Sequence, residues 1–240
     1  MIRGIYNSSA AMQYLMERTD TVANNLANAN TVGFKRSDIA FNMYMTAEHA
    51  TRRNQINDPL PRGELKTFVD HTQGALKQTA NPLNIAIEGQ GYFTIQTPEG
   101  TAWTRDGGFT MNEHGYLTTM DGYFVMGEWG PILLQGNNFS VSYEGDIVYD
   151  NQVVNRFLLQ NFDKSDVLQK GSNLYFPRDE FIELSEANPL LKQGFIEASN
   201  VSVIKEMIAM ITIQRQYQAN EKAIRTNDEA LQRTVRDIAR

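Results

Sequence analysis

Apolar residues recur at helical spacing at both ends of the chain, whereas its middle has the short alternating runs of β-strands. Near the start they follow alternating steps of three and four residues, and near the end they recur every seven. A column at this spacing forms a stripe that must face another helix. We therefore predict two terminal helices that form a coiled coil. The front column is Ile5, Ser8, Met12, Leu15, Thr19, Val22, Leu26 and Ala29, and the back column is Val203, Met210, Tyr217, Ile224, Leu231 and Ile238.

Residues that start or stop helices mark the limits of the two helices. The first helix is predicted over residues 5–29, because Gly33 lies just beyond it and tolerates the left-handed conformation that ends helices. The second is predicted over residues 201–240, with Asn200 as its N-terminal cap. Between them, residues 39–45 fit either a short helix or an extended segment.

The middle of the chain predicts β-structure. Strands are expected over residues 84–88 and 92–96, joined by a turn at Gly89-Gln90-Gly91. Turn signals rich in Gly, Asp and Asn then arrive about every ten residues, which is typical of hairpins in a sandwich or barrel. Residues 164–195 lack this pattern and are predicted to be irregular. The further runs that predict strands lie at 132–134, 139–143, 147–149 and 156–162.

The fold class is therefore α+β, with two terminal helices and a central all-β domain that is sandwich-like or barrel-like. We divide the chain into five parts. These are an N-terminal coiled-coil helix (1–36), a connecting region with an extended piece at 65–69 (37–82), the central β domain (83–163), an irregular return segment (164–197) and a C-terminal coiled-coil helix (198–240).

Composition and charge exclude several classes of protein. The formal net charge is −6, and the first and last forty residues carry +1 and +2, which leaves −9 for the middle. The chain thus lacks the basic stripe of a nucleic-acid-binding protein. It has no cysteine, which excludes a thiol nucleophile and disulfides. No apolar run is long enough to span a membrane. The uncharged stretch Gly4–Met16 is too polar for the core of a signal peptide, so we expect an amphipathic helix and no cleaved leader.

Few residues of the sequence suggest catalysis or the binding of a metal or cofactor. His49, His71 and His114 do not have the spacing of metal ligands. The Gly89-Gln90-Gly91 segment precedes a strand, so no helix N-terminus is available there to bind a phosphate. Acidic side chains cluster near Glu144 and again at residues 179–183, as solvated turns commonly do. We predict no enzymatic activity, no catalytic residue, no metal and no cofactor.

Several motifs resemble those of bacterial flagellar rod and hook proteins. The strongest are residues 24–36 (NNLANANTVGFKR) and 197–201 (EASNV), followed by the helix segment 206–217. Residues 81–93 and 103–107 of the β region are also similar to the family pattern. The resemblance covers nearly the whole chain, with its motifs in the family's order.

Within that family the chain is most similar to the F-type, proximal rod subunit. Residues 81–83 and 127–132 look F-like, and the segment 46–82 is shorter than the G-type distal rod subunit usually carries. The alternatives are a distal rod subunit or a hook-type axial subunit. A candidate from a different class is a secreted carbohydrate-binding or hydrolytic β domain with helical tails.

The resemblance implies a structural subunit of the flagellar basal-body rod, which serves motility. Such proteins pass through the type III export apparatus without a cleaved signal peptide. They then assemble helically in the periplasm, with the terminal helices as an inner coiled coil around a channel. The implied partners are proximal and distal rod subunits, the export apparatus and the surrounding basal-body rings, with neither nucleic acid nor membrane insertion.

We expect the terminal helices to be mobile in the free subunit, because a lone amphipathic helix gains little by folding, and to order on assembly. Asn24, Asn25 and Asn28 fit two interpretations, a local helix cap or hydrogen bonds to the next subunit. The predicted assembly interface comprises Ile5, Met12, Leu15, Val22, Asn24, Asn25, Leu26, Asn28, Phe34, Val203, Met207, Met210, Tyr217, Ile224, Leu231 and Ile238.

Overall fold

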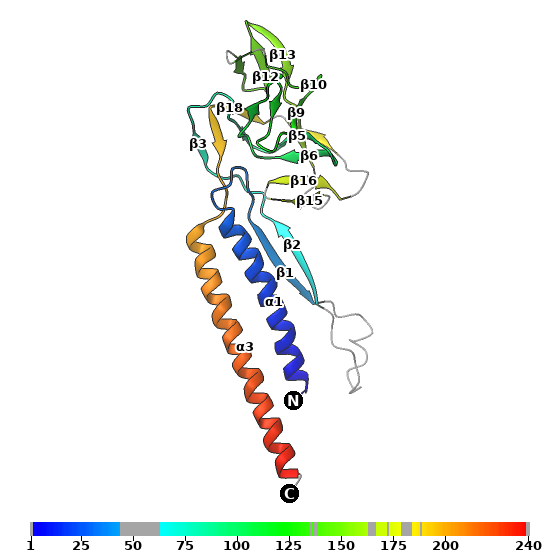
Figure 1. Ribbon diagram of the computed structural model, residues 1–240, viewed down its shortest axis with the longest axis vertical. Coiled ribbons are helices and arrows are strands. Elements are labelled where there is room, and N and C mark those ends of the chain that lie inside the picture. The colour runs from blue at the N-terminus through cyan, green and yellow to red at the C-terminus, as the bar shows by residue number, and fades with distance from the viewer. Residues whose placement is uncertain are drawn as a thin grey trace. The chain divides into compact units, whose positions relative to one another are not determined.

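The fold is α+β, with a helix at each end of the chain and a β-rich region between them (Figure 1). The structure is a computed structural model. It describes residues 2–43, 63–134, 136, 139–162, 167–171, 173–178, 184–187 and 189–238. The chain divides into two compact units. The helical unit comprises Met1–Ala27, Ser37–Asp70 and Ser202–Arg240, and the β unit comprises Asn28–Arg36 and His71–Val201.

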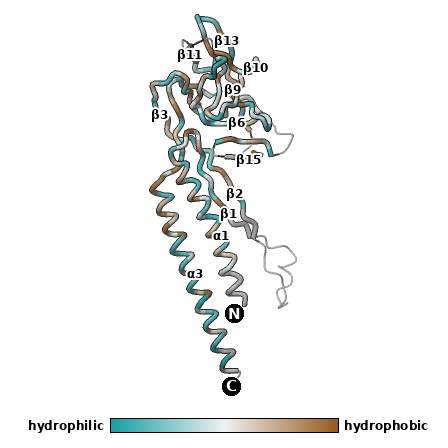
Figure 2. The backbone as a smooth tube through the Cα atoms, in the orientation of Figure 1, coloured by the Kyte–Doolittle hydropathy of each residue, from teal (hydrophilic) through white to brown (hydrophobic). Residues whose placement is uncertain are grey.

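The helical unit is built on two long antiparallel helices, α1 (Ile2–Ala27) and α3 (Val203–Ile238) (Figure 1). They pack through a small apolar cluster of Leu15, Val22 and Ile213. Apolar residues gather in the first half of α3, and its second half is more polar (Figure 2).

The cap predicted for the C-terminal helix was wrong. Ser202 precedes the helix, and its carbonyl accepts the first helical hydrogen bond, from the Glu206 N–H at 3.0 Å. Asn200 lies too far before the helix for this role. Its side chain accepts a hydrogen bond from the Arg36 N–H at 2.7 Å instead.

The helical unit also contains a β-hairpin. Strand β1 (Ser37–Met43) pairs antiparallel with β2 (Gly63–Val69), from Ser37 opposite Val69 to Met43 opposite Gly63. Strand β1 lies against α1 and buries Ile39. Of the two alternatives for residues 39–45, the extended one is therefore correct for the described part, and the extended piece predicted at 65–69 is confirmed.

The β unit forms several antiparallel sheets around one apolar core. The largest has the strand order β15-β16-β6-β5-β9-β8-β7, joined by β10, β14 and β17. Smaller sheets pair β11-β12-β13, β18 with β4, and β19 with β3. The strands are β3 (Leu76–Gln78), β4 (Ile85–Glu88), β5 (Tyr92–Thr97), β6 (Gly100–Thr104), β7 (Thr110–Met111), β8 (Leu117–Thr118), β9 (Phe124–Gly127), β10 (Gly130–Pro131), β11 (Phe139–Val141), β12 (Asp146–Tyr149), β13 (Gln152–Arg156), β14 (Leu159–Asn161), β15 (Val167–Lys170), β16 (Leu174–Pro177), β17 (Ser185–Glu186), β18 (Leu190–Gln193) and β19 (Phe195–Glu197).

The strands that the sequence predicts at 84–88 and 92–96 are present as β4 and β5. The Gly89-Gln90-Gly91 link joins strands of two different sheets rather than a hairpin. Gly89 and Gly91 have φ values of +110° and +134°, which other residues rarely adopt.

Residues 164–195 were wrongly predicted to be irregular. They contain β15, β16, β17 and β18. These strands are short, and β18 pairs with β4, about a hundred residues earlier, with Leu190 opposite Glu88. Pairing at such a distance leaves no local pattern in the sequence. Conversely, residues 132–134, predicted as a strand, form only a single bridge between Leu133 and Tyr116.

The core of the β unit is tightly packed around Phe93, which is fully buried. Its ring centroid lies 5.0 Å from that of Phe109 and 5.6 Å from that of Phe157. We predict that Phe93→Ala lowers the free energy of unfolding by about 3–5 kcal/mol, because it leaves a cavity that its neighbours cannot fill. Urea denaturation followed by tryptophan fluorescence measures the loss.

Phe124→Ala is the matched control. Phe124 lies in the same sheet, but its side chain is 38% exposed, so its truncation should cost less than about 1 kcal/mol. Equal losses for the two variants would contradict this description of the core.

Candidate assembly interface

One face of α3 packs against α1. Glu206 and Ile213 are buried there, and Met210 and Tyr217 are half-buried. The predicted column of α3, whose members recur every seven residues from Val203, therefore lies beside a second column at residues 206, 213, 220 and 227. Periodicity did not reveal the second column because three of its four residues, Glu206, Asn220 and Asn227, are polar.

A different face of α3 carries large apolar side chains that its own unit does not cover. Ile204, Met207, Ile208 and Ile211 are 72%, 50%, 60% and 51% exposed. Their spacing of three, four and seven residues places them on one side of the helix. We call these four residues the α3 stripe. Val203, at its edge, is also exposed.

The predicted interface residues of α1 fall into different environments. Leu15 and Val22 are buried in the seam, while Met12 and Leu26 are half-buried. The backbones of Ile5, Leu231 and Ile238 are helical, and their side chains lie outside the described part of the structure.

The three asparagines differ sharply in burial. Asn24 is exposed. Asn28 accepts a hydrogen bond from the Thr31 hydroxyl at 3.1 Å, a local contact at the end of the helix. Asn25 is fully buried and bonds the backbone of Ser37. Its side chain therefore has a role within the chain rather than as a helix cap.

In the β unit, the two strongest sequence motifs meet at the carboxylate of Glu197. The Lys35 ammonium contacts Glu197 Oε1, and Arg105 Nη1 lies 3.2 Å from Oε2. The Gly74 N–H donates to Oε1 at 2.9 Å. All three charged side chains are buried, and the shared carboxylate compensates the charge of both cations.

The backbones of the same two motifs are also joined. The Gly33 N–H donates to the Glu197 carbonyl at 2.9 Å, and Asn200 Nδ2 donates to the Thr72 carbonyl at 3.2 Å. Phe34 is buried beside this junction in the chain. Its predicted place in the assembly interface is thus internal to the β unit, where it can support assembly only indirectly.

Aromatic rings surround the junction. The guanidinium of Arg105 lies 5.2 Å from the ring centroid of Tyr92. Burial raises the pKa of Tyr92 to about 12, and the nearby Arg105 charge offsets only part of this effect. Burial also raises the pKa of Tyr175. Both phenols therefore stay neutral at physiological pH and pack as aromatic side chains.

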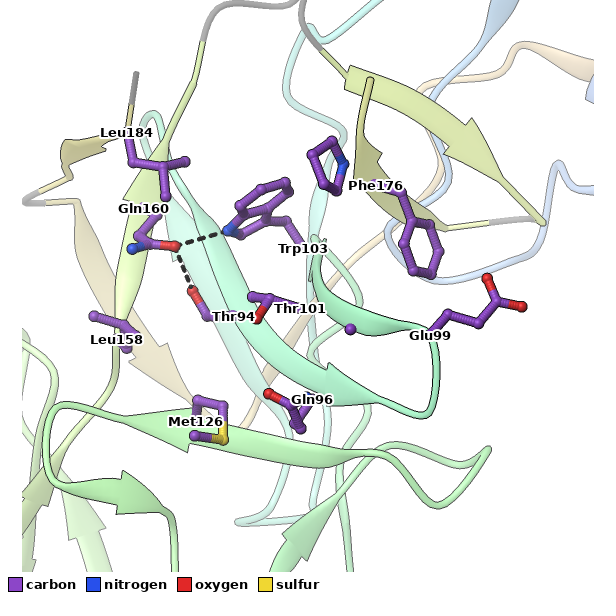
Figure 3. A pocket seen from close by; sticks show the side chains of 12 residues that line it. Thr94, Gln96, Glu99, Thr101, Trp103, Met126, Leu158, Gln160, Phe176 and Leu184 are labelled. Atoms are coloured by element: carbon purple, nitrogen blue, oxygen red, sulfur yellow. Dashed lines mark hydrogen bonds between the residues drawn. The ribbon is translucent and has the colours of Figure 1, made fainter. Parts of the chain in front are cut away.

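An open cavity of about 710 Å³ lies on the sheet face formed by β5, β6 and β14, where Gln160 Oε1 accepts hydrogen bonds from Trp103 Nε1 at 2.8 Å and from Thr94 at 3.2 Å (Figure 3). Among the described residues that line it, Glu99 is the one carboxylate, whereas a glycosidase uses two.

The described residues contain no cluster of acidic or histidine side chains that could hold a metal ion. No helix among them is long and apolar enough to cross a membrane. Of the histidines, His114 lies exposed in a turn and His71 contacts the Tyr92 hydroxyl. His49 lies outside the described residues.

Comparison with known proteins decides the family. Three family profiles match the chain in order. They are "Flagella basal body rod protein" over residues 5–35, "Flagellar hook protein FlgE/F/G D1 domain" over 86–149 and "Flagellar basal body rod FlgEFG protein C-terminal" over 192–237. The flagellar basal-body rod protein FlgG of Bacillus subtilis is 35% identical, with 98% of each chain covered. This chain belongs to the flagellar basal-body rod protein family.

Relatives of both rod types are similar to this chain. FlgF of Mesorhizobium japonicum is 32% identical, over 95% of each chain, and FlgF of Rhizobium meliloti is 31% identical. The resemblance to the rod family is confirmed. Its finer assignment to the F-type stays a prediction, because FlgF and FlgG relatives show comparable identities.

Removal of the shared carboxylate should destabilise this rod-family protein strongly. We predict that Glu197→Ala lowers the free energy of unfolding by about 3–5 kcal/mol, because Lys35 and Arg105 would stay buried and lose the carboxylate that they share. Lys192→Ala is the control. It breaks a Lys192–Glu88 pair of 2.8 Å that is partly exposed, and should cost at most about 1 kcal/mol in urea denaturation. A loss below 1 kcal/mol for Glu197→Ala would refute the assigned role.

Asp106 makes the stability of the protein depend on pH. Burial raises its pKa from 3.8 to about 6, although its carboxylate accepts hydrogen bonds from the Gly108 N–H and from Asn173. The pKa of Asp106 is higher in the folded protein than in the unfolded chain. Its contribution to the free energy of unfolding is therefore fully present below pH 3.8 and is lost as the pH rises through about 6.

We therefore predict that the stability of the unmodified protein falls relative to Asp106→Asn, by about 2 kcal/mol, between pH 4 and pH 7. Urea denaturation of both proteins across this range measures the difference. Parallel pH profiles would show that Asp106 does not titrate in this way.

Proposed function

We propose that this protein is a structural subunit of the flagellar basal-body rod and that it assembles through its terminal helices. The α3 stripe is the observation that carries this proposal. One face of α3 is satisfied by α1 within the chain, and a second face is apolar and exposed. Such a face on a helix favours contact with further helices.

Approximate free energies of burial and association favour a cooperative assembly. Burial of one large apolar side chain contributes about 1.5–3 kcal/mol, whereas association costs about 4–15 kcal/mol in lost freedom. The four side chains of the stripe give a gain of similar size to this cost. A single contact between two subunits would therefore be weak, and stable assembly would need several neighbours at once.

The residues of the predicted interface divide into two roles. Met207 and Val203 flank or belong to the exposed stripe and would contact neighbours directly. Leu15, Val22, Asn25 and Phe34 are buried within their units and would act by holding the chain in shape. Met210 and Tyr217 pack in the α1–α3 seam and would also act within the chain. We retain as direct contacts the other predicted positions, Ile5, Met12, Asn24, Leu26, Asn28, Ile224, Leu231 and Ile238.

The finer features of the rod family remain proposals for this chain. The α1–α3 pair would form a coiled coil, and the β unit a sandwich-like or barrel-like domain. The five-part division would keep its boundaries, with strands in place of irregular structure in the part 164–197. The partners would be proximal and distal rod subunits, the export apparatus and the basal-body rings. The protein would reach the periplasmic rod without a cleaved signal peptide. The seam of Leu15, Val22 and Ile213 pairs the helices within one chain, so the expected ordering on assembly would concern the parts of the helices beyond that seam.

Ile208→Glu tests the stripe. Position 208 is 60% exposed, so the substitution should change the stability of the isolated protein by no more than about 0.5 kcal/mol. It should nevertheless abolish rod assembly, because assembly would bury an unpaired charge. Thermal melting, recovery of the protein in purified basal bodies and swimming of a strain that lacks the native copy measure the two effects.

Two controls separate assembly from folding. Gln216→Glu adds the same charge at an exposed position outside the stripe and should leave assembly intact. Ile213→Glu places it in the buried seam and should destabilise the isolated protein. If Ile208→Glu entered basal bodies as well as the unmodified protein did, the proposed interface would be wrong.

A further inference from the structure

The seam between α1 and α3 contains a buried polar pair among its apolar contacts. Asn25 of α1 is 0% exposed and Glu206 of α3 is 2% exposed. Asn25 Nδ2 lies 3.5 Å from Glu206 Oε2. Neither side chain is favourable in an apolar seam unless its polar atoms have partners, because loss of hydration is costly there.

Asn25 also connects the helix pair to the first strand. Its Nδ2 donates to the Ser37 carbonyl at 2.7 Å, and the Ser37 N–H donates to its Oδ1 at 2.9 Å. The side chain thus meets the backbone of β1 at its first residue and the carboxylate of α3 together. The bonds to Ser37 join α1 to β1, whereas the contact with Glu206 forms only when α3 is in this alignment.

Apolar packing alone does not fix that alignment. The apolar column of α3 repeats every seven residues, at Met210, Tyr217 and Ile224. A slide of one helix by seven residues would replace one apolar member of the column with the next. The same slide would place Asn25 opposite Ile213 and would carry Glu206 past the end of α1, so the contact between Asn25 and Glu206 would be lost and Asn25 would face an apolar side chain.

We propose that Asn25 and Glu206 form a register lock, which selects one alignment of α1 against α3 from several that the apolar column permits. The lock opposes slipped pairing within a chain and between copies of this chain. Buried polar residues in helix seams are known to select register at some cost in stability. The inference rests on the helix pair alone and does not depend on the proposed function.

Two cysteine pairs in the full-length chain can report the register, because the protein has no cysteine of its own. The alignment of Asn25 with Glu206 places Val22 opposite Ala209, so the pair Val22→Cys and Ala209→Cys reports the observed register. After a slide of seven residues, Val22 would face Gln216, so Val22→Cys with Gln216→Cys reports the slipped register. Disulfide yields, within a chain or between two copies, are read on non-reducing gels.

The lock is removed by Asn25→Leu together with Glu206→Leu. We expect the ratio of slipped to native disulfide to rise about tenfold, because the penalty against slipped registers is lost. Thr19→Leu is the control, since it makes the same seam more apolar and leaves the polar pair in place. An unchanged ratio in the double variant, or an equal rise in Thr19→Leu, would overturn the proposal.

A second pair of variants keeps the test decisive if the apolar double variant loses its helix content. Asn25→Asp removes the donor and places two carboxylates together, so the slipped product should increase. Adding Glu206→Gln supplies a donor to the new carboxylate and should return the ratio toward that of the native pair. If the ratio did not recover, the contact between residues 25 and 206 would not set the register.

Discussion

The packing of α3 against α1 along only one of its faces is the constraint on which the helical unit depends. Leu15, Val22 and Ile213 bury one stripe of each helix. A helix with a single apolar face would then be complete. Instead, α3 carries Ile208 and its neighbours on another face, exposed within the unit. Together with membership of the rod family, this second face is the basis for our proposal that helices of neighbouring subunits cover α3.

The β unit depends on a different interaction, a buried group of charged side chains. Its boundary segments come from opposite ends of the chain and meet where Glu197 pairs with Lys35 and Arg105. A buried charge is costly without compensation. If either segment separated from the other, Lys35 and Glu197 would lose their ion pair. The motifs at residues 24–36 and 197–201 that resemble the rod family thus have a structural reason to occur together. The pairing holds the first and last parts of the β unit in one place.

The sequence predicted the elements whose pattern is local and failed where the partners are distant. Long apolar columns identified both helices, and turn residues identified β4 and β5 with their neighbours. The pairing of β18 with β4 left no local signal. Periodicity placed Leu26 on the seam, whereas the structure buries Asn25 most fully, because its side chain serves the backbone of Ser37. Glu206 and Ile213 were missed because their column is mostly polar.

Chemical labelling of single cysteines tests most directly whether α3 uses one face within the chain and another between chains. Ile208→Cys and Ile213→Cys would each introduce the only cysteine of the protein. The account predicts that a maleimide labels position 208 rapidly in the free subunit and slowly in assembled rods, and labels position 213 slowly in both. Equal labelling of the two positions in the free subunit, or undiminished labelling of position 208 in rods, would contradict it.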